Sequence, residues 1–159
     1  MKKLLAVLLI AGLAYSGPML AQSPKSLLLG KWVLDVESVQ APLEMRPKSV
    51  TMTYSEAGDG KWRTDADVLG RDGHEIHATA TYPLNGTAAP SKGYPTVDTT
   101  AVALPTPNVM VAAFYLKGMP RTTRTYTVAA DGKTMLETVV WLNINGKPEI
   151  TTNRFNRAD

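Results

Sequence analysis

The 159-residue sequence contains no cysteine. This absence excludes disulfide bridges, thiolate zinc sites and cysteine nucleophiles. A folded domain must therefore be held together by the burial of apolar side chains and by backbone hydrogen bonds. The chain is long enough for this, because a domain of such size buries roughly two thirds of the surface that its unfolded chain exposes.

Long hydrophobic runs are also missing, apart from one at residues 4–14 that directly follows Lys2 and Lys3. This run is too short to cross a bilayer as a helix, which needs about 20 apolar residues. Its length and its positive flank are typical of the apolar core of a secretory signal peptide. We therefore expect an exported bacterial protein, periplasmic or secreted, with no stable membrane span once the leader is removed. The alternative is a retained N-terminal anchor.

Two positions after the run fit cleavage of a signal peptide. One follows Ser16, and the other follows Ala21, beyond a Gly-Pro dipeptide that breaks the leader helix. We favour the second position. It assigns residues 1–21 to the signal peptide and residues 22–159 to the mature domain.

No strong excess of either charge remains once the leader is set aside. The full chain carries 17 Lys and Arg against 14 Asp and Glu, and removing Lys2 and Lys3 leaves 15 against 14. Nucleic-acid-binding domains gather Lys and Arg on one face, whereas here they are scattered. The densest basic stretch, residues 121–124, is interpreted as a solvated strand face. The sequence therefore predicts no nucleic-acid partner.

Signatures of catalysis are lacking as well. No serine lies in a Gly-x-Ser-x-Gly elbow, and no glycine-rich phosphate loop is present. The two histidines, His74 and His77, are three residues apart, so on a strand they point to opposite faces and cannot share a metal ion. One of them could hold a haem iron inside a barrel, although an exposed or hydrogen-bonded histidine is favoured. We expect neither an enzyme nor a cofactor or metal site.

Glu137 is the one carboxylate in an unusual setting, because Met135 and Val139 share its strand face. An inward Glu137 would be a polar anchor in a cavity. We favour the outward orientation, beside exposed apolar residues.

The pattern that is present is alternation with a period of two, which indicates half-buried strands. Apolar and polar residues alternate through residues 50–54, 61–68 and 75–82, and Asp-Gly or Asn-Gly turn signals follow or separate such runs. The expected strands are 31–37, 48–56, 61–69, 74–83, 96–104, 108–117, 121–129, 134–143 and 148–156.

Short turns between these strands predict an all-β antiparallel up-and-down meander of eight or nine strands. Closure into a barrel removes the two exposed edges that an open meander would leave. Two stretches break the alternation: residues 41–47, with two prolines, and residues 84–95, rich in Gly and Pro. We expect the first to be a crossover or a rim loop and the second to be an irregular loop, either a lid at the barrel mouth or a mobile connection.

Gly30-Lys31-Trp32 in the first strand resembles the Gly-x-Trp motif of lipocalins and related calycin barrels. The resemblance implies a lipocalin-like barrel with an Arg or Lys of the last strand stacked on the Trp, a place that Arg154 or Arg157 would take. We assign barrel closure to Gly30, Trp32 and Arg154. The chain also resembles small exported bacterial proteins of uncharacterised function with such barrels, in the stretches 30–34, 47–51, 70–73, 94–95, 131–134, 145–147 and 155–157.

If Trp32 points inward, alternation predicts which residues line the barrel. Small residues on the early strands would leave space for a ligand between aromatic walls. The candidate ligand-binding residues are Met52, Tyr54, Trp62, Ala78, Ala80 and Tyr82.

Three functions remain open at this stage. The first is the binding of a small hydrophobic or amphipathic molecule in the barrel. The second is a filled barrel that binds another envelope protein through the apolar strand 108–116 or the Pro-rich loops. The third is an enzyme acting on a lipid. An open cavity would distinguish the first from the second, and a convergent polar pair within it would support the third.

Overall fold

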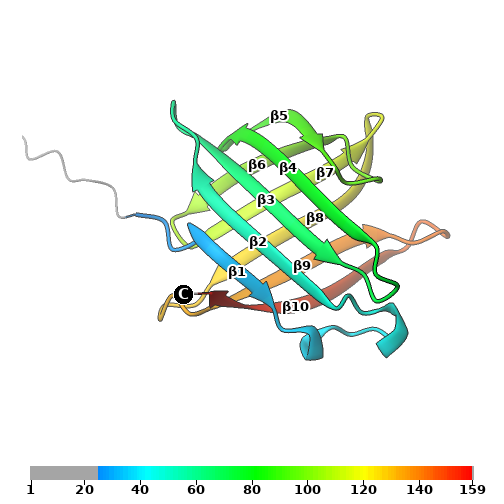
Figure 1. Ribbon diagram of the computed structural model, residues 1–159. Coiled ribbons are helices and arrows are strands. Elements are labelled where there is room, and N and C mark those ends of the chain that lie inside the picture. The colour runs from blue at the N-terminus through cyan, green and yellow to red at the C-terminus, as the bar shows by residue number, and fades with distance from the viewer. Residues whose placement is uncertain (1–24, 159) are drawn as a thin grey trace, which may run out of the picture.

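The computed structural model describes residues 25–158. Within this range the chain forms ten strands in one closed antiparallel barrel (Figure 1). The predicted signal peptide, residues 1–21, lies outside the described residues. No helix among the described residues is long and apolar enough to cross a membrane.

Every strand of the barrel pairs with its neighbours in chain order, and β10 pairs with β1 to close the ring. The strands are β1 (Gly30–Leu34), β2 (Ser49–Glu56), β3 (Lys61–Leu69), β4 (Glu75–Pro83), β5 (Asn85–Lys92), β6 (Thr99–Thr106), β7 (Val109–Leu116), β8 (Met119–Val128), β9 (Thr134–Leu142) and β10 (Pro148–Ala158). Two short 3-10 helices, η1 (Val36–Ser38) and η2 (Leu43–Met45), lie between β1 and β2.

The all-β closed meander is confirmed, but the expected number of strands is wrong. The additional strand is β5, which occupies most of the stretch that we expected to be an irregular loop. Gly86 and Pro90 weaken its local strand pattern, and a bulge follows Asn85. Pairing with β6 makes it a strand, and such pairing is a tertiary influence that local propensity does not contain.

The rim stretch between β1 and β2 also differs in detail from the prediction. β1 ends at Leu34 rather than at residue 37, and η1 follows it directly. Residues 41–47 are indeed not a strand, and they contain η2.

One end of the barrel is closed by the segment that precedes β1. Ser26 and Leu27 donate hydrogen bonds to the Pro107 carbonyl on the opposite side of the barrel, through a hydroxyl and a backbone amide. Leu28 is fully buried, and its carbonyl accepts a hydrogen bond of 2.8 Å from the Trp32 indole. Trp32 is therefore inward-facing and buried, as the resemblance implied.

Arg157, not Arg154, stacks on Trp32. The Arg157 guanidinium carbon lies 4.2 Å from the centre of the indole ring, and the two residues are direct partners in the β1–β10 ladder. Arg154 lies an odd number of residues away on the same strand, so it points outward, and it pairs with Asp35 at 3.1 Å. The assignment of Arg154 to barrel closure is wrong for this reason.

Arg157 also ties the last strand to the N-terminal segment. Its guanidinium donates hydrogen bonds to the carbonyls of Leu27, Leu29 and Gly132. Gly30 leaves room for it: the φ angle of Gly30 is +116°, and an added Cβ would lie 2.7 Å from Arg157 Nη1. The glycine of the Gly-x-Trp motif is therefore needed because a side chain at this position would collide with the Arg157 guanidinium.

Strand β7, expected to be apolar on both faces, has a buried inner face at Met110 and Ala112. Its outer residues Val109, Val111 and Ala113 are half-buried rather than exposed. The outer face of β7 therefore does not stand out as an open apolar patch.

Candidate functional site

The barrel encloses a cavity of about 600 Å³. All ten strands contribute to its lining, and residues of η2 and of the β3–β4 turn border it at its mouth. Figure 1 shows these two segments at the same end of the barrel. The apolar part of the lining comprises Leu34, Val50, Met52, Ala66, Val68, Ala78, Ala80, Val102, Met110, Ala112, Phe114 and Phe155.

Five of the six candidate ligand-binding residues line this cavity: Met52, Tyr54, Ala78, Ala80 and Tyr82. They face inward because β2, β3 and β4 pair in a register that places Met52 beside Ala66 and Ala66 beside Ala78. Three small or flexible side chains on adjacent strands leave the space that the sequence predicted. Their role as ligand contacts stays a prediction.

Trp62 is the exception among the six. It is buried and belongs to the same core as Trp32, but it does not line the cavity. Its ladder partner Glu56 lies at the β2–β3 turn, close to the closed end of the barrel. Trp62 therefore fills the closed end of the barrel. Alternation predicts that its side chain points inward, but not how far along the barrel axis it lies.

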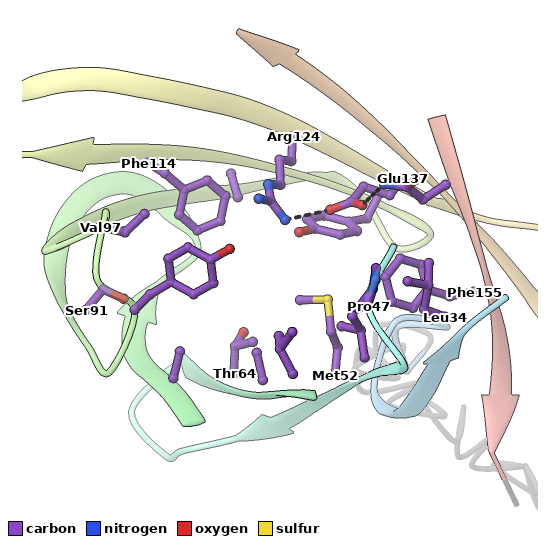
Figure 2. A pocket seen from close by; sticks show the side chains of 18 of the residues that line it. Leu34, Pro47, Met52, Thr64, Ser91, Val97, Phe114, Arg124, Glu137 and Phe155 are labelled. Carbon is purple, nitrogen blue, oxygen red and sulfur yellow. Dashed lines mark hydrogen bonds and ion pairs between the residues drawn. The ribbon is translucent and has the colours of Figure 1, made fainter. Parts of the chain in front are cut away.

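A polar group of residues interrupts the apolar lining on the side formed by β8, β9 and β10 (Figure 2). Arg124 Nη1 donates a hydrogen bond of 3.0 Å to Glu137 Oε1, and Asn153 Nδ2 donates one of 2.7 Å to Glu137 Oε2. Tyr126, Glu137 and Asn153 are direct neighbours across the three strands. The Arg124 guanidinium also lies 5.2 Å from the centre of the Phe114 ring.

Two interpretations of the sequence are corrected by this group. Glu137 points inward and is 2% exposed, whereas we expected it to face solvent. Arg124 is half-buried and lines the cavity, whereas residues 121–124 were expected to be a solvated face; Arg121 and Thr123 are exposed. Both errors have one cause: each ion was judged without its partner, and the ion pair stabilises the buried Glu137 carboxylate.

Three tyrosines of the cavity wall, Tyr54, Tyr82 and Tyr126, are held in their neutral form by their surroundings. Burial, with a smaller contribution from the negative charge of Glu137, raises the pKa of Tyr126 above its ordinary value. Burial likewise raises the pKa of Tyr54, and it raises the pKa of Tyr82 to about 12. Burial lowers the pKa of Arg124, but the neighbouring Tyr126 and Glu137 outweigh it and the net shift is upward. Arg124 is therefore a permanent cation.

Both histidines lie away from the cavity. His74 and His77 are exposed, and His77 Nδ1 pairs with Asp67 on the outer face of β3 and β4. Among the described residues, no group of three or more His, Asp or Glu side chains is placed to hold a metal ion.

The polar group could have been found in the sequence. In residues 123–128, Arg124, Tyr126 and Val128 alternate with threonines and therefore share one face of the strand. Tyr126 pairs with Met110 of β7, whose side chain points inward. Met135 and Val139 share the face of Glu137, which is the signal for an inward strand face. The missing information was that this face had a basic partner on β8.

Comparison with known proteins shows the fold alone. No family model matches the chain, and no curated protein matches it. Solved structures of the fluorescent protein UnaG do: the wild type has a TM-score of 0.54 at 15% identity and covers 82% of this chain and 96% of its own. An asparagine-to-alanine mutant of UnaG has a TM-score of 0.55 at 15% identity and covers 84% of this chain and 97% of its own. The chain thus has the fold of a calycin-type β-barrel, which confirms the fold that the Gly-x-Trp resemblance implied.

Proposed function

We propose that this protein binds a small hydrophobic or amphipathic molecule inside the barrel. The observation that carries the proposal is the cavity of about 600 Å³, which combines an apolar lining with a cluster of polar groups on β8, β9 and β10 and with charged residues at its mouth. Sites for small molecules have this size and this composition. A barrel whose only role was to present its outer surface would gain stability from filling such a space.

The mouth of the cavity offers a route for the ligand. Arg46, Pro47, Arg71 and Tyr94 border it together with Met45, whose side chain is 73% exposed. An exposed methionine beside an apolar cavity suits an entering apolar molecule, because its flexible thioether adapts to different shapes.

The experiment is native mass spectrometry of the protein purified from its own host, compared with the denatured mass. We expect an added mass that leaves on denaturation, and its value begins to identify the ligand. A bare chain that also takes up nothing from a lipid extract would contradict the proposal.

A matched pair of variants tests the location of the bound molecule. Ala80→Phe places a ring inside the cavity, whereas Thr81→Phe places the same ring on the outer face of the same strand. The first variant should lose the added mass and the second should keep it. Equal retention by both would place the ligand elsewhere.

We also propose that the protein acts outside the cytoplasm, on the strength of the leader pattern at residues 1–21. N-terminal sequencing of the protein from a periplasmic or culture fraction should find Gln22 first. A membrane-bound chain that keeps the leader would contradict this and support the anchor alternative.

A further inference from the structure

Among the described residues that line the cavity, three buried side-chain polar atoms have no hydrogen-bond partner: Thr79 Oγ1 on β4 and a pair on β8, the Tyr126 hydroxyl and Arg124 Nε. Both side chains line the cavity from the same face of β8. Tyr126 is 1% exposed. A buried donor without a partner costs free energy on the order of 1–3 kcal/mol. These two donors therefore indicate where the polar part of a ligand would be held.

The charge beside these donors is already balanced. The Arg124 cation is paired with the Glu137 anion, and Asn153 donates to the second carboxylate oxygen. The charged residues at the mouth also compensate one another, since Arg46 and Arg71 are accompanied by Glu44 and Asp72. A ligand that brought a carboxylate would add an uncompensated negative charge next to Glu137.

The buried tyrosines of the cavity wall agree with this preference. A phenolate is an anion formed in the cavity wall, and the raised pKa of Tyr126, Tyr54 and Tyr82 means that such an anion is disfavoured there. Desolvation is the largest cause for each of the three, and it would act on any anionic head group in the same place.

We propose that the ligand is a neutral amphipathic molecule with a carbonyl oxygen, such as an amide, ester or ketone, that accepts hydrogen bonds from Tyr126 and Arg124 Nε. A carbonyl oxygen has two lone pairs and can accept from both donors. The apolar part of the molecule would then lie toward Met52 and Thr64, which face Arg124 and Glu137 across the cavity (Figure 2). The small side chains of β3 and β4 provide the space there. This inference rests on the proposed function and specifies its ligand.

The test compares two ligands that differ only in the head group, dodecanamide and dodecanoate, at about pH 8, where a fatty acid in water is ionised. Binding is measured by competition against a fluorescent apolar probe. The wild type should bind the amide at least about tenfold more tightly than the carboxylate, the ratio expected for one satisfied hydrogen bond against one uncompensated charge.

Glu137→Gln should reverse this preference. The variant keeps the shape and an acceptor for Arg124 but removes the anion, so the guanidinium is left to pair with a ligand carboxylate. Dodecanoate should gain at least about tenfold in affinity. Asp65→Asn is the matched control: it makes the same change of charge in the Arg63–Asp65 pair on the outer face of the barrel, and it should leave both affinities unchanged.

Tyr126→Phe provides a second variant, in case Glu137→Gln does not fold. It removes one donor and no charge, and it should reduce the preference for the amide while uptake of the apolar probe persists. A wild-type preference for dodecanoate, or an amide preference that Tyr126→Phe leaves unchanged, would overturn the neutral-ligand inference and leave the proposed function standing. Failure of the probe and of both ligands to bind would overturn the proposed function itself.

Discussion

At the scale of single residues, the closed end of the barrel depends on the contacts of Trp32 and Arg157. Trp32 is fully buried, donates to Leu28 and carries the Arg157 guanidinium on its ring. Arg157 in turn binds three backbone carbonyls, including two in the segment that covers this end. The side chain of Arg154, three residues earlier, points outward and pairs with Asp35 at the barrel surface.

Arg157→Ala and Arg154→Ala should therefore differ in stability. We expect Arg157→Ala to lower the free energy of unfolding by about 2–3 kcal/mol, through loss of the cation–π contact and of carbonyl hydrogen bonds. Arg154→Ala should cost less than about 1 kcal/mol, as exposed ion pairs usually do. Urea denaturation measures both. Equal losses would mean that the stack on Trp32 does not close the barrel.

Gly30→Ala should be destabilising for two reasons that act together. The φ angle of +116° is one that L-residues rarely adopt, and the new Cβ would displace the Arg157 guanidinium. We expect a loss of about 1–3 kcal/mol in the free energy of unfolding. In the double variant with Arg157→Ala the loss should be smaller than the sum of the two single losses, since they share the contact. Full additivity would show that Gly30 acts through its backbone alone.

At the scale of elements, the ring of strands is not equally strong all the way round. β4 pairs with β3 along its whole length, from Glu75 to Pro83. It pairs with β5 only through Thr79 with Lys92 and Ala80 with Ser91. β5 also contains Pro90, which has no N–H to donate, and a bulge in its pairing with β6.

Hydrogen–deuterium exchange should show that the barrel opens most easily at the short β4–β5 ladder. Backbone amides of β5 should exchange faster than those of β7 and β8, whose ladder runs from Val109 to Leu116, because local opening needs fewer hydrogen bonds to break. If the ligand also enters between β4 and β5, ligand binding should slow exchange in β5. Protection of β5 equal to that of β7 would contradict the unequal ring.

At the scale of the whole molecule, the polar part of the cavity interior has no net charge, because the Arg124 cation is paired with the Glu137 anion. Three buried tyrosines of the cavity wall, Tyr54, Tyr82 and Tyr126, have a raised pKa in the folded state, with burial as the main cause. A phenol whose pKa is higher in the folded than in the unfolded chain favours the fold while it is protonated.

Stability should therefore fall in alkali. Below the unfolded tyrosine pKa of 10.0, each phenol is protonated in both states and its contribution is fully present. As the pH rises from there through the folded pKa of Tyr82, about 12, the unfolded chain loses protons first and the free energy of unfolding declines.

Denaturation monitored across this pH range, alongside tyrosinate absorbance, measures the effect. Tyr82→Phe should reduce the slope, because it removes one of the three groups. A free energy of unfolding that stayed constant up to pH 12 would mean that these phenols are not buried from solvent.

Much of the barrel was accessible from sequence because it depends on local alternation. The runs around Met52, Trp62 and Ala78 predicted both the strands and their inward faces, since side chains on a strand alternate strictly. The inward Trp32 and the closed meander followed from a motif and from the cost of free edges. The missing strand, β5, was the one whose residues look least like a strand and whose pairing partner supplies its conformation.

The sequence by itself determined the all-β class, the order of most strands and the apolar wall formed by β2, β3 and β4, because these depend on a period of two along the chain. Only the tertiary structure decided that Arg157 rather than Arg154 covers Trp32, that Trp62 fills the closed end, and that Arg124 and Glu137 meet inside. Each of these depends on register between strands or on height along the barrel. Alternation indicates the inward faces of β8 and β9, but a charged side chain is stabilised there by its partner, and the meeting of Arg124 with Glu137 depends on the register between the two strands.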